Sequence, residues 1–541
     1  MPMNLSRLKG ILAALLLILL LSACAPEPWE DVKDPVWWND AIFYQVFVRS
    51  YYDSDGDGIG DFKGLTAKLD YLNDGDPNTT TDLGISGIWL MPIHPSPSYH
   101  GYDVTDYLAI NPDYGSMDDF KAFLAEAQRR NIRVIIDLVI NHTSIEHPWF
   151  VASAGGEAEK RDWYIWSDTH YTYPGPWGQD VWHPWGDAYY YAVFWSGMPD
   201  LNFRHPEVTR EIKQIAAFWL QDIGVDGFRV DGAKHLIEEN ANQENTAATH
   251  AWFRDSHREN KALSPDSLTV GEVWDSSENA SRYVNEGAMD LVFNFPLAED
   301  ILSGVTFGDA NRIANSITQQ ERAYHTGQYA AFLSNHDTAR TMTRFFGEVP
   351  KAKVAATILL TSPGVPFIYY GEEIGMSGDK PDPLIRTPMH WTGGENAGFT
   401  TGEPWQRISG DYMLRNVEIM DDDPASLLNH YRQLIAIRNN HYALRTGEYV
   451  QVQTNHRRLF AMLRVAEKEA VLVIANLGNE ALPGPQLSWE QSPLSGSLRP
   501  IVLMGAGRFA PLQTDEIGGV EVYQPLAEIP PFESVILQFR R

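Results

Sequence analysis

Cysteine is nearly absent from this 541-residue sequence, since Cys24 is its single example. The folded part can therefore hold no internal disulfide, no cysteine metal cluster and no cysteine nucleophile. The chain also lacks a Gly-x-x-x-x-Gly-Lys-Ser/Thr phosphate loop, and no convincing dinucleotide fingerprint follows a predicted strand. Lysine and arginine (42 residues) are outnumbered by aspartate and glutamate (71 residues), and the formal net charge is −29. This charge argues against nucleic acid or an anionic membrane surface as a partner and favours neutral or cationic ligands.

The start of the chain has the pattern of an export signal. A basic segment precedes an apolar run over residues 11–21, which is too short to span a bilayer comfortably and fits the core of a secretory signal. The following Leu-Ser-Ala-Cys resembles a bacterial lipobox, in which the cysteine, here Cys24, becomes the lipidated first residue. We expect a signal peptide over residues 1–23, a tether over 24–36 and an exported, extracytoplasmic protein that contacts a bacterial membrane only through lipidated Cys24. A plain signal anchor is the alternative.

The length predicts two or three domains. A hydrophobic content of 44% and an aromatic content of 12% are typical of a well-packed globular protein. Strand and helix patterns alternate eight times over residues 37–445, which predicts a closed (β/α)8 TIM barrel of the α/β class. After the last predicted barrel helix, short alternating runs separated by turn residues predict an antiparallel β-sandwich over residues 446–541.

An insertion follows the predicted third strand, residues 133–138, and is too long for an ordinary βα loop. It covers about residues 142–203, and the segment from Trp149 to Trp195 contains fifteen aromatic residues, both ends included, interleaved with proline and glycine. We expect it to fold as an irregular subdomain over the mouth of the barrel. Aromatic faces exposed in a cleft suit the apolar faces of sugar rings, although half or more of these side chains are equally well explained as core.

Four predicted strands end in acidic residues: Asp137, Asp231, Glu272 and Asp337. Side chains alternate along a strand, so Arg229 and Asp231 share one face, and the guanidinium holds Asp231 ionised. A structural ion pair would explain this stretch if it stood alone. Polar residues at the carboxyl ends of several parallel strands, however, are what the mouth of a (β/α)8 barrel supplies, and this predicts an active site there.

Two carboxyl groups that differ in protonation are what glycoside hydrolysis requires. Asp231, held by Arg229, is suited to attack an anomeric carbon. Glu272 stands between a glycine and two apolar residues, and such dehydrating surroundings raise the pKa of a carboxyl group. Glu272 can therefore hold the proton that the leaving oxygen takes.

An acidic, glycine-rich loop follows the predicted first strand. Its carboxylates stand at alternate positions, and such a loop can wrap oxygen atoms around a hard cation, for which Ca2+ fits best. The predicted metal-binding residues are Asp53, Asp55, Asp57, Ile59 and Asp61. The loop is not an EF-hand, because Gly64 occupies the twelfth position, where a bidentate glutamate is required. An acidic turn without a metal is the alternative.

Four short motifs follow one another along the chain. They are Asp137-Leu-Val-Ile-Asn141-His142, Gly227-Phe-Arg229-Val-Asp231-Gly-Ala-Lys234-His235, Gly271-Glu272-Val-Trp and Phe332-Leu-Ser-Asn-His336-Asp337. In sequence and order they resemble the motifs of the α-amylase family, glycoside hydrolase family 13. Met198-Pro-Asp-Leu-Asn202 resembles the fifth motif of a branch intermediate between oligo-1,6-glucosidases and neopullulanases. The resemblance covers about residues 37–541.

The resemblance implies a retaining hydrolase, with Asp231 as nucleophile, Glu272 as general acid and base, and Asp337 as a carboxylate that holds ring hydroxyls. In such enzymes the first two carboxyl groups lie about 5–5.5 Å apart. The implied substrate-binding residues are Arg229 as partner of the nucleophile, His142 and His336 as hydroxyl ligands, Tyr102 as stacking platform, and Lys234 and His235 on the leaving side. Asn141 resembles a ligand of the calcium between barrel and insertion. The Asp53–Asp61 loop resembles the calcium loop of the oligo-1,6-glucosidase branch.

The expected substrate follows from details of the motifs. Exo-acting α-glucosidases of the family often carry an acid shortly before the Tyr102 motif, and Ser98-Tyr-His-Gly-Tyr102 has none. Lys234-His235 resembles the leaving-side subsite of enzymes that act on α-1,4-glucans. We therefore expect an endo-acting α-amylase on starch or maltooligosaccharides, with some transglycosylation. The alternatives are an α-glucosidase, a cyclomaltodextrinase or neopullulanase-type hydrolase and, outside the enzymes, a glucan-binding surface lipoprotein.

Overall fold

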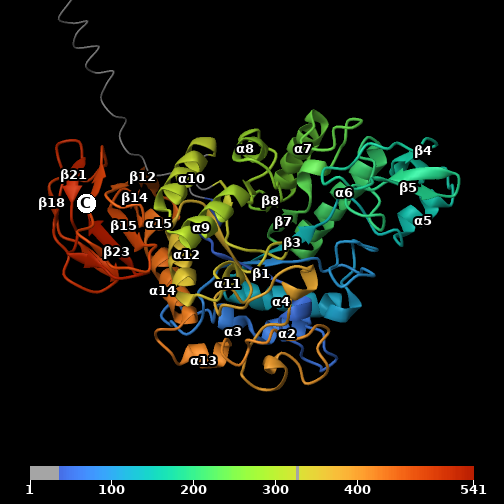
Figure 1. Cartoon of the computed structure of the whole chain (residues 1–541). Helices are drawn as coiled ribbons and strands as arrows, with labels where there is room; N and C mark the ends of the chain where they lie inside the picture. Colours follow the sequence, from blue (N-terminus) through green and yellow to red (C-terminus); the bar gives the residue numbers. More distant parts are fainter. Residues whose placement is uncertain (1–35, 325–327, 541) are drawn as a thin grey trace, which may run out of the picture.

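Eight parallel strands form a barrel at the centre of the molecule (Figure 1). The computed structural model describes residues 36–324 and 328–540. The strand order is β10-β11-β1-β2-β3-β7-β8-β9, and a parallel bridge between Phe293 and Ala330 joins the two ends of this sheet. The bounds are β1 (Phe43–Val46), β2 (Gly87–Leu90), β3 (Arg133–Leu138), β7 (Gly227–Val230), β8 (Leu268–Gly271), β9 (Leu291–Val292), β10 (Ala330–Ala331) and β11 (Val365–Tyr369). The predicted (β/α)8 barrel is thus confirmed.

The strands are continuous apolar runs because both of their faces are buried. Alternate side chains such as Phe43, Trp89 and Phe367 fill the interior, where the rings of Phe43 and Phe367 stack with their centroids 4.5 Å apart. Their neighbours, such as Tyr44 and Ile88, pack in the larger core that includes the surrounding helices. The barrel is therefore a packed core, and its polar residues gather where the strands end.

Helices surround the barrel, and local capping sets where they begin. Helix α4 (Met117–Arg129) starts after Ser116, whose side chain forms a reciprocal capping box with Asp119. Its buried face carries Phe120 and Phe123. The other main helices of the barrel are α2 (Phe62–Ala67), α3 (Leu69–Leu72), α6 (Pro206–Ala217), α7 (Ala247–Leu263), α8 (Ser277–Asn285), α9 (Phe295–Phe307), α10 (Ala310–Ala323), α12 (Val349–Thr361) and α14 (Leu427–Asn440).

The sixth barrel strand is shorter than the sequence predicts. Alternation predicts a strand over residues 290–295, whereas β9 has two residues and Phe295 already begins α9. The side chain of Asn294 accepts a hydrogen bond from the backbone N–H of Leu297 at 3.1 Å and caps the helix. Capping therefore ends the strand where hydrophobicity alone would continue it.

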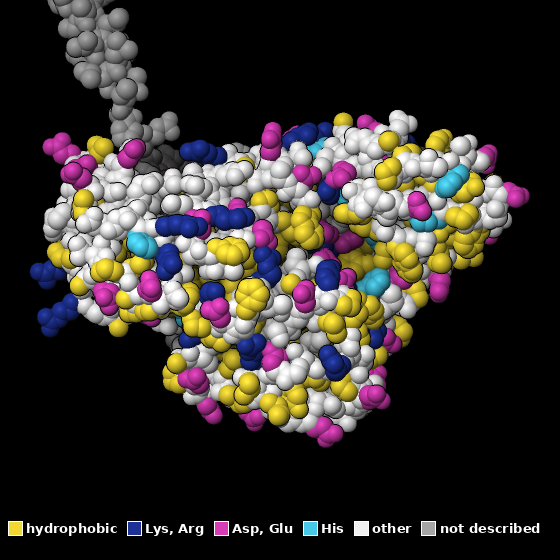
Figure 2. Space-filling model, in the orientation of Figure 1, with side chains coloured by type: hydrophobic (Ala, Val, Ile, Leu, Met, Phe, Trp, Pro, Cys, Tyr) yellow, Lys and Arg dark blue, Asp and Glu magenta, His cyan; other side chains and the backbone are white. Residues whose placement is uncertain are grey.

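The segment between β3 and α6 forms a lobe at one end of the molecule (Figure 1). It has a small antiparallel sheet in the order β4-β6-β5 and a core of its own that includes Trp182 and Tyr191. Much of the rest is irregular, as predicted, and hydrophobic side chains gather on its surface (Figure 2). The bounds are α5 (Pro148–Ala154), β4 (Trp166–Ser167), β5 (Trp182–Trp185) and β6 (Ala188–Tyr191).

Antiparallel sheets form the C-terminal domain, at the opposite end of the molecule from the inserted lobe (Figure 1). A five-stranded sheet has the order β12-β14-β15-β23-β19, a three-stranded sheet has the order β13-β17-β21, and side chains from both share one core. The bounds are β12 (Glu448–Gln451), β13 (Gln453–Thr454), β14 (Leu459–Val465), β15 (Glu469–Asn476), β17 (Leu487–Trp489), β19 (Ile501–Met504), β21 (Val520–Tyr523) and β23 (Ser534–Arg540). The predicted sandwich architecture is confirmed.

The predicted signal peptide and the lipidation residue Cys24 lie outside the described residues, as does the predicted tether up to residue 35. Among the residues that are described, no helix has the length and apolar character needed to cross a membrane. The predicted lipid anchor and the exact domain limits stay predictions.

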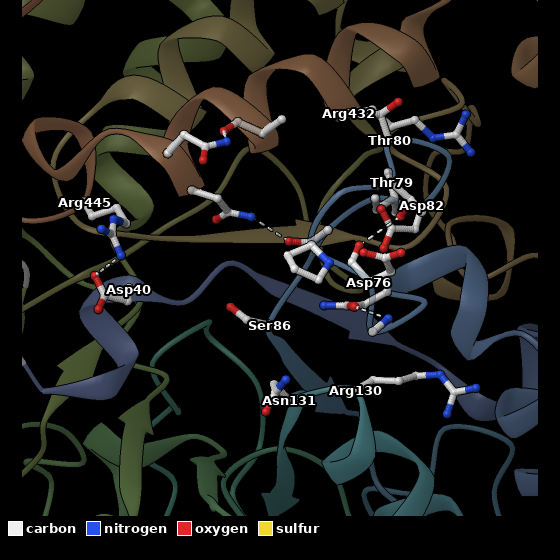
Figure 3. Close-up of a pocket in the computed structure, with 18 residues that line it drawn as sticks. Asp40, Asp76, Thr79, Thr80, Asp82, Ser86, Arg130, Asn131, Arg432 and Arg445 are labelled. Carbon is white, nitrogen blue, oxygen red and sulfur yellow. Dashed lines mark hydrogen bonds and ion pairs between the residues drawn. The ribbon is translucent and has the colours of Figure 1, made fainter.

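A polar cavity of about 440 Å³ lies at the end of the barrel where the strands begin (Figure 3). Asp40, Ser86 and Asn131 line it and precede β1, β2 and β3. Arg445 pairs with Asp40 at one side of it (Figure 3), with Nη1 and Oδ1 2.9 Å apart. None of the described residues that line it is aromatic, and this end of a (β/α)8 barrel typically contributes stability rather than catalysis.

Two buried arginines bind carbonyl oxygens at the end of α12, one from the C-terminal domain and one from the barrel itself. Arg464 on β14 donates to the carbonyl oxygens of Thr361 at 3.0 Å and Gly447 at 2.7 Å. Arg438 on α14 donates to three carbonyl oxygens at the end of α12 and in the turn after it. Burial lowers the pKa of Arg464 to about 10, so its guanidinium stays charged at neutral pH beside the negative end of the α12 dipole.

Replacing Arg464 by methionine should lower the melting temperature of the whole protein. The change leaves two buried carbonyl oxygens without donors, which we expect to cost about 2–4 kcal/mol. Differential scanning calorimetry on Arg464→Met would measure the loss. The matched control is Arg457→Met, because Arg457 lies in the same domain and forms an exposed ion pair with Asp309 that contributes little. Equal melting temperatures for both variants would contradict the role assigned to Arg464.

Candidate active site

Arg229 lies at the centre of a polar cluster at the mouth of the barrel. It is the third residue of β7, and alternation directs it to the same side as Asp231. Its Nη1 donates to Oδ1 of Asp137 at 2.8 Å and to Oδ1 of Asp231 at 2.6 Å, and its Nη2 donates to Oε2 of Glu272 at 2.5 Å. One guanidinium thus holds a carboxylate from β3 and carboxylates that directly follow the neighbouring strands β7 and β8.

The cluster has a buried layer and a layer that solvent can reach. The side chains of Arg229 and Asp137 are 1% and 0% exposed. By contrast, the side chains of Asp231, Glu272 and Asp337 are 12%, 17% and 27% exposed. The three residues predicted to be catalytic are therefore accessible to a ligand, while their main cation lies beneath them.

Burial raises the pKa of the carboxyl groups around Arg229. The pKa is raised to about 6 for Asp231 and for Asp137, and to about 7 for Glu272. Attraction to Arg229 opposes each increase, whereas the charges of Asp231 and Asp337 raise the pKa of Glu272 further. At neutral pH, Glu272 is thus the carboxyl group that most readily holds a proton, and Asp231 is mainly ionised.

The turn after Asp231 requires glycine. Gly232 has a φ of +50°, and a Cβ at this position would lie 2.7 Å from the ring of Phe194. Its backbone N–H donates to Oε2 of Glu272 at 3.1 Å. A glycine here therefore lets the chain turn under Phe194 and also fixes the orientation of Glu272.

His336 is neutral and its tautomer is fixed by Gln45. The side-chain amide nitrogen of Gln45, which can only donate, lies 2.7 Å from Nδ1 of His336. Nε2 therefore carries the proton, and it lies 2.5 Å from Oη of Tyr102 and 3.0 Å from Oδ2 of Asp337. The Tyr102 hydroxyl donates in turn to Oδ2 of Asp137 at 3.1 Å. Burial keeps the pKa of His336 well below its usual value.

Tyr102, predicted as a stacking platform, lies against His336, with ring centroids 5.5 Å apart and an angle of 10° between the planes. Asp337 is held from its other side by Arg386, whose Nη2 donates to Oδ1 at 3.0 Å. Arg386 also donates from Nε to the backbone carbonyl of His336 at 2.9 Å. This second arginine therefore does for Asp337 what Arg229 does for Asp231.

The other predicted binding residues surround this cluster. His142 is buried, its Nε2 lies 3.1 Å from the carbonyl oxygen of Tyr102, and burial lowers its pKa to about 4, so it is neutral. Lys234 pairs with Glu244 at 2.5 Å. The ring of His235 lies 5.3 Å from that of the exposed Trp177 of the inserted lobe. The structure thus brings barrel and lobe together beside Asp231, while the assigned roles stay predictions.

The acidic loop after β1 brings the carboxylates of three predicted metal-binding residues close together. Oxygen atoms of Asp53, Asp55 and Asp61 all lie within 4.8 Å of one another, and Asp57 is not part of this group. Asp53 accepts hydrogen bonds from three backbone N–H groups of the loop and from the Thr400 hydroxyl. These donors are neutral, so the negative charge of the group is left for a cation. The carboxylate set fits a hard ion such as Ca2+.

Asn141 lies apart from that loop, at the junction of barrel and lobe. Its Nδ2 donates to Oδ2 of the buried Asp200 at 3.0 Å, and its Oδ1 is buried without a hydrogen-bond partner among the described residues. An unpaired oxygen beside a carboxylate is compatible with a cation. Two side-chain oxygens alone, however, are fewer than the six to eight that Ca2+ takes. The structure therefore supports a metal site at Asn141 less strongly than one at the Asp53 loop.

Gln45 and Arg386 belong to the site but were not predicted from the sequence. Gln45 could have been found, because it is the single amide in the apolar run that forms β1. Arg386 carries no such signal, since it stands in an irregular loop after β11, 49 positions from Asp337.

Comparison with known proteins places the chain in a family. Residues 45–447 match the family described as alpha amylase, catalytic domain. Alpha-amylase 3 of Dictyoglomus thermophilum is 42% identical over 448 residues, covering 82% of this chain and 85% of that protein. An oligo-1,6-glucosidase of Bacillus cereus is 32% identical over 525 residues, covering 82% of this chain and 91% of that protein. The crystal structure of an α-amylase from H. orenii superposes with a TM-score of 0.81 at 40% identity, covering 93% of this chain and 99% of that chain.

The matched region spans most of the chain, begins within β1 and contains the other seven strands of the barrel together with the inserted lobe. It also contains Arg229 and the carboxylates that this arginine holds. The chain therefore belongs to the α-amylase family of glycoside hydrolases.

Proposed function

We propose that this protein is a retaining, endo-acting α-amylase that hydrolyses α-1,4-glucosidic bonds in starch and maltooligosaccharides. The single observation that carries the proposal is the sharing of the Arg229 guanidinium by Asp231 and Glu272 at the barrel mouth. Two carboxyl groups on one planar cation lie close together. Burial raises the pKa of both, and Glu272 has the higher value, which is the order that double displacement needs.

The proposed reaction has two steps. Asp231 attacks the anomeric carbon while Glu272 gives its proton to the leaving glycosidic oxygen, and a β-glycosyl-enzyme forms. Glu272, now ionised, takes a proton from the incoming water, whose oxygen displaces Asp231. Arg229 stabilises the carboxylate of Asp231 before and after the covalent step.

The remaining side chains bind the sugar in this proposal. Asp337, His142 and His336 hold ring hydroxyls in the cleaved subsite, and Tyr102 packs against the ring. Lys234 and His235 bind on the leaving side. His336 is neutral with its proton on Nε2 and therefore adds no positive charge beside Asp337. That proton contacts Oη of Tyr102 in the free protein, so it would have to turn from Tyr102 to a sugar hydroxyl when substrate binds.

The relatives favour an amylase over the other members of the family. The relative at 42% identity and the solved structure at 40% identity are both named α-amylase, whereas the oligo-1,6-glucosidase is 32% identical. An α-glucosidase or a cyclomaltodextrinase-type hydrolase with transglycosylation is the alternative. Early products from soluble starch distinguish them, because an endo-acting enzyme releases a range of maltooligosaccharides and glucose alone would contradict the proposal.

We also propose that the loop of Asp53, Asp55 and Asp61 binds Ca2+. The ion would tie the segment after β1 to the loop that contains Thr400, since Asp53 already contacts both. For Cys24 the proposal remains that of the sequence: export and lipid anchoring to a bacterial membrane, supported by the Leu-Ser-Ala-Cys motif.

Asp231→Asn should abolish hydrolysis of starch and retain glucan binding. The amide keeps the shape of the carboxylate but cannot attack the anomeric carbon, so we expect a loss of at least ~10⁴-fold in kcat. Reducing-sugar release and isothermal titration with maltooligosaccharide measure the two properties. Asp40→Asn, at the opposite end of the barrel, is the control and should keep full activity. Near-normal turnover in Asp231→Asn would refute the assignment.

The pH dependence of kcat/KM should be bell-shaped, with flanks near pH 6 and pH 7. Activity falls on the acid side because Asp231 gains a proton, and on the alkaline side because Glu272 loses one. With an aryl maltooside, whose leaving group needs no acid, Glu272→Gln should still form the glycosyl-enzyme and should lose the alkaline decline. A wild-type profile that stays flat from pH 5 to pH 9 would be incompatible with these roles.

Removal of calcium should lower the melting temperature, because an ion that binds only the folded state stabilises it. The gain is about 2.7 kcal/mol when free Ca2+ is a hundred times its Kd. Asp55→Asn keeps the oxygen that accepts from the Asp57 N–H, so its melting temperature in chelator should equal that of the wild type. It should, however, gain less on adding Ca2+. An identical response of both proteins to Ca2+ would show that the ion binds elsewhere.

A further inference from the structure

An aromatic-lined cavity lies apart from the residues assigned to catalysis, none of which lines it. It measures about 560 Å³, and it is formed where the inserted lobe meets the long loop that follows β7. Tyr171, Tyr173 and Trp182 of the lobe supply its aromatic lining. Its polar groups include Arg204, at the end of the lobe, and Glu238.

The aromatic lining has a rigid base and an exposed ring. Trp182 is buried in the core of the lobe, and its Nε1 donates to the hydroxyl of Tyr173 at 2.9 Å. The ring of Tyr171 lies against Trp182, with centroids 5.2 Å apart, yet the residue is 47% exposed. A ring fixed from behind and open in front is an available stacking surface that costs little conformational entropy to use.

The polar lining can both donate and accept. Because Tyr173 accepts from Trp182, its own proton is available to a ligand oxygen. Nη2 of Arg204 donates to the backbone carbonyl of Glu238 rather than to its side chain, so the carboxylate of Glu238 is an acceptor beside it. The amide of the exposed Asn240 offers one further acceptor and two donors. Such a set matches a ligand whose hydroxyl groups act as donors and acceptors at once.

The cavity is built into the fold. The hydroxyl of Tyr191 in the lobe donates to Oε1 of Gln243 at 2.8 Å, and Nε2 of Gln243 donates to the carbonyl oxygen of Pro174 at 2.9 Å. These two bonds pin the loop after β7 against the lobe. The same loop begins at Asp231, so a ligand held at Glu238 or Asn240 sits on the segment that carries the proposed nucleophile.

The chemistry points to a neutral sugar polymer rather than to an ion. Glu238 and Glu239 outnumber Arg204 in the lining, and together with the net charge of −29 they disfavour an anionic ligand. An apolar ring face with hydroxyl groups at its rim matches an aromatic platform edged by hydrogen-bonding groups. We propose that this cavity, lined by Tyr171 and Glu238, is a second glucan-binding site outside the catalytic cluster. The inference rests on the proposed action on glucans. Two sites on one chain of polymer raise the effective concentration of substrate at the active site.

Tyr171→Ala should weaken retention of the full-length protein on insoluble starch about tenfold, because it removes the stacking ring. The measurement uses an Asp231→Asn background so that starch is not digested. Tyr171→Phe keeps the ring and should be retained like the parent. Phe307→Ala, which removes an exposed aromatic ring from the end of α9, is the matched control and should also be unchanged.

In the active enzyme, Tyr171→Ala should raise KM for starch and leave kcat/KM for maltotriose unchanged, because a short substrate cannot reach both sites. Glu238→Gln keeps the hydrogen-bonding oxygen and should retain starch binding. Unaltered retention of Tyr171→Ala would overturn the proposal, and so would loss of retention in Glu238→Gln alone, which would indicate a charge-dependent ligand. A failure of the proposed function is seen separately, as absence of starch hydrolysis by the wild-type enzyme.

Discussion

One buried cation organises the active end of this barrel. Arg229 contacts carboxylates that lie on or directly after three different strands, and without it these acidic side chains would repel one another in a region that water barely reaches. Two arginines, Arg229 and Arg386, do not neutralise all the negative charge of the cluster. They face four carboxyl groups, those of Asp137, Asp231, Glu272 and Asp337. Burial raises the pKa of Glu272, and the charges of Asp231 and Asp337 raise it further, so that Glu272 can hold a proton at neutral pH.

The sequence predicts those features that depend on short-range patterns. Barrel strands appear as apolar runs, and the placement of Arg229 two residues before Asp231 follows from side-chain alternation alone. The contact of Gln45 with His336 spans 291 positions and is decided by which strands become neighbours. Strand limits were less predictable where another local rule competes, as at Asn294, where helix capping overrides hydrophobicity. In the acidic loop, the spacing found the carboxylates but did not show that Asp57 stays outside the group.

The inserted lobe and the barrel are interdependent parts of one site. The backbones of His142 and Asp200 form an isolated antiparallel β-bridge at their junction. The ring centroid of Phe194, in the lobe, lies 5.2 Å from that of His142. The same Phe194 confines position 232 to glycine. Aromatic residues of the lobe thus have two uses. Some make its core and its contact with the barrel, while others, such as Trp177 and Tyr171, present exposed rings.

The contact between Arg464 and the end of α12 affects how such a protein can evolve by exchange of domains. Arg464 reaches out of the C-terminal domain to satisfy a carbonyl oxygen of α12, the helix that leads into the eighth strand. A barrel separated from its sandwich would expose that helix end and part of its apolar surface. The C-terminal domain is thus structurally part of the catalytic unit. Recombination at this boundary would require the new domain to supply an arginine in place of Arg464.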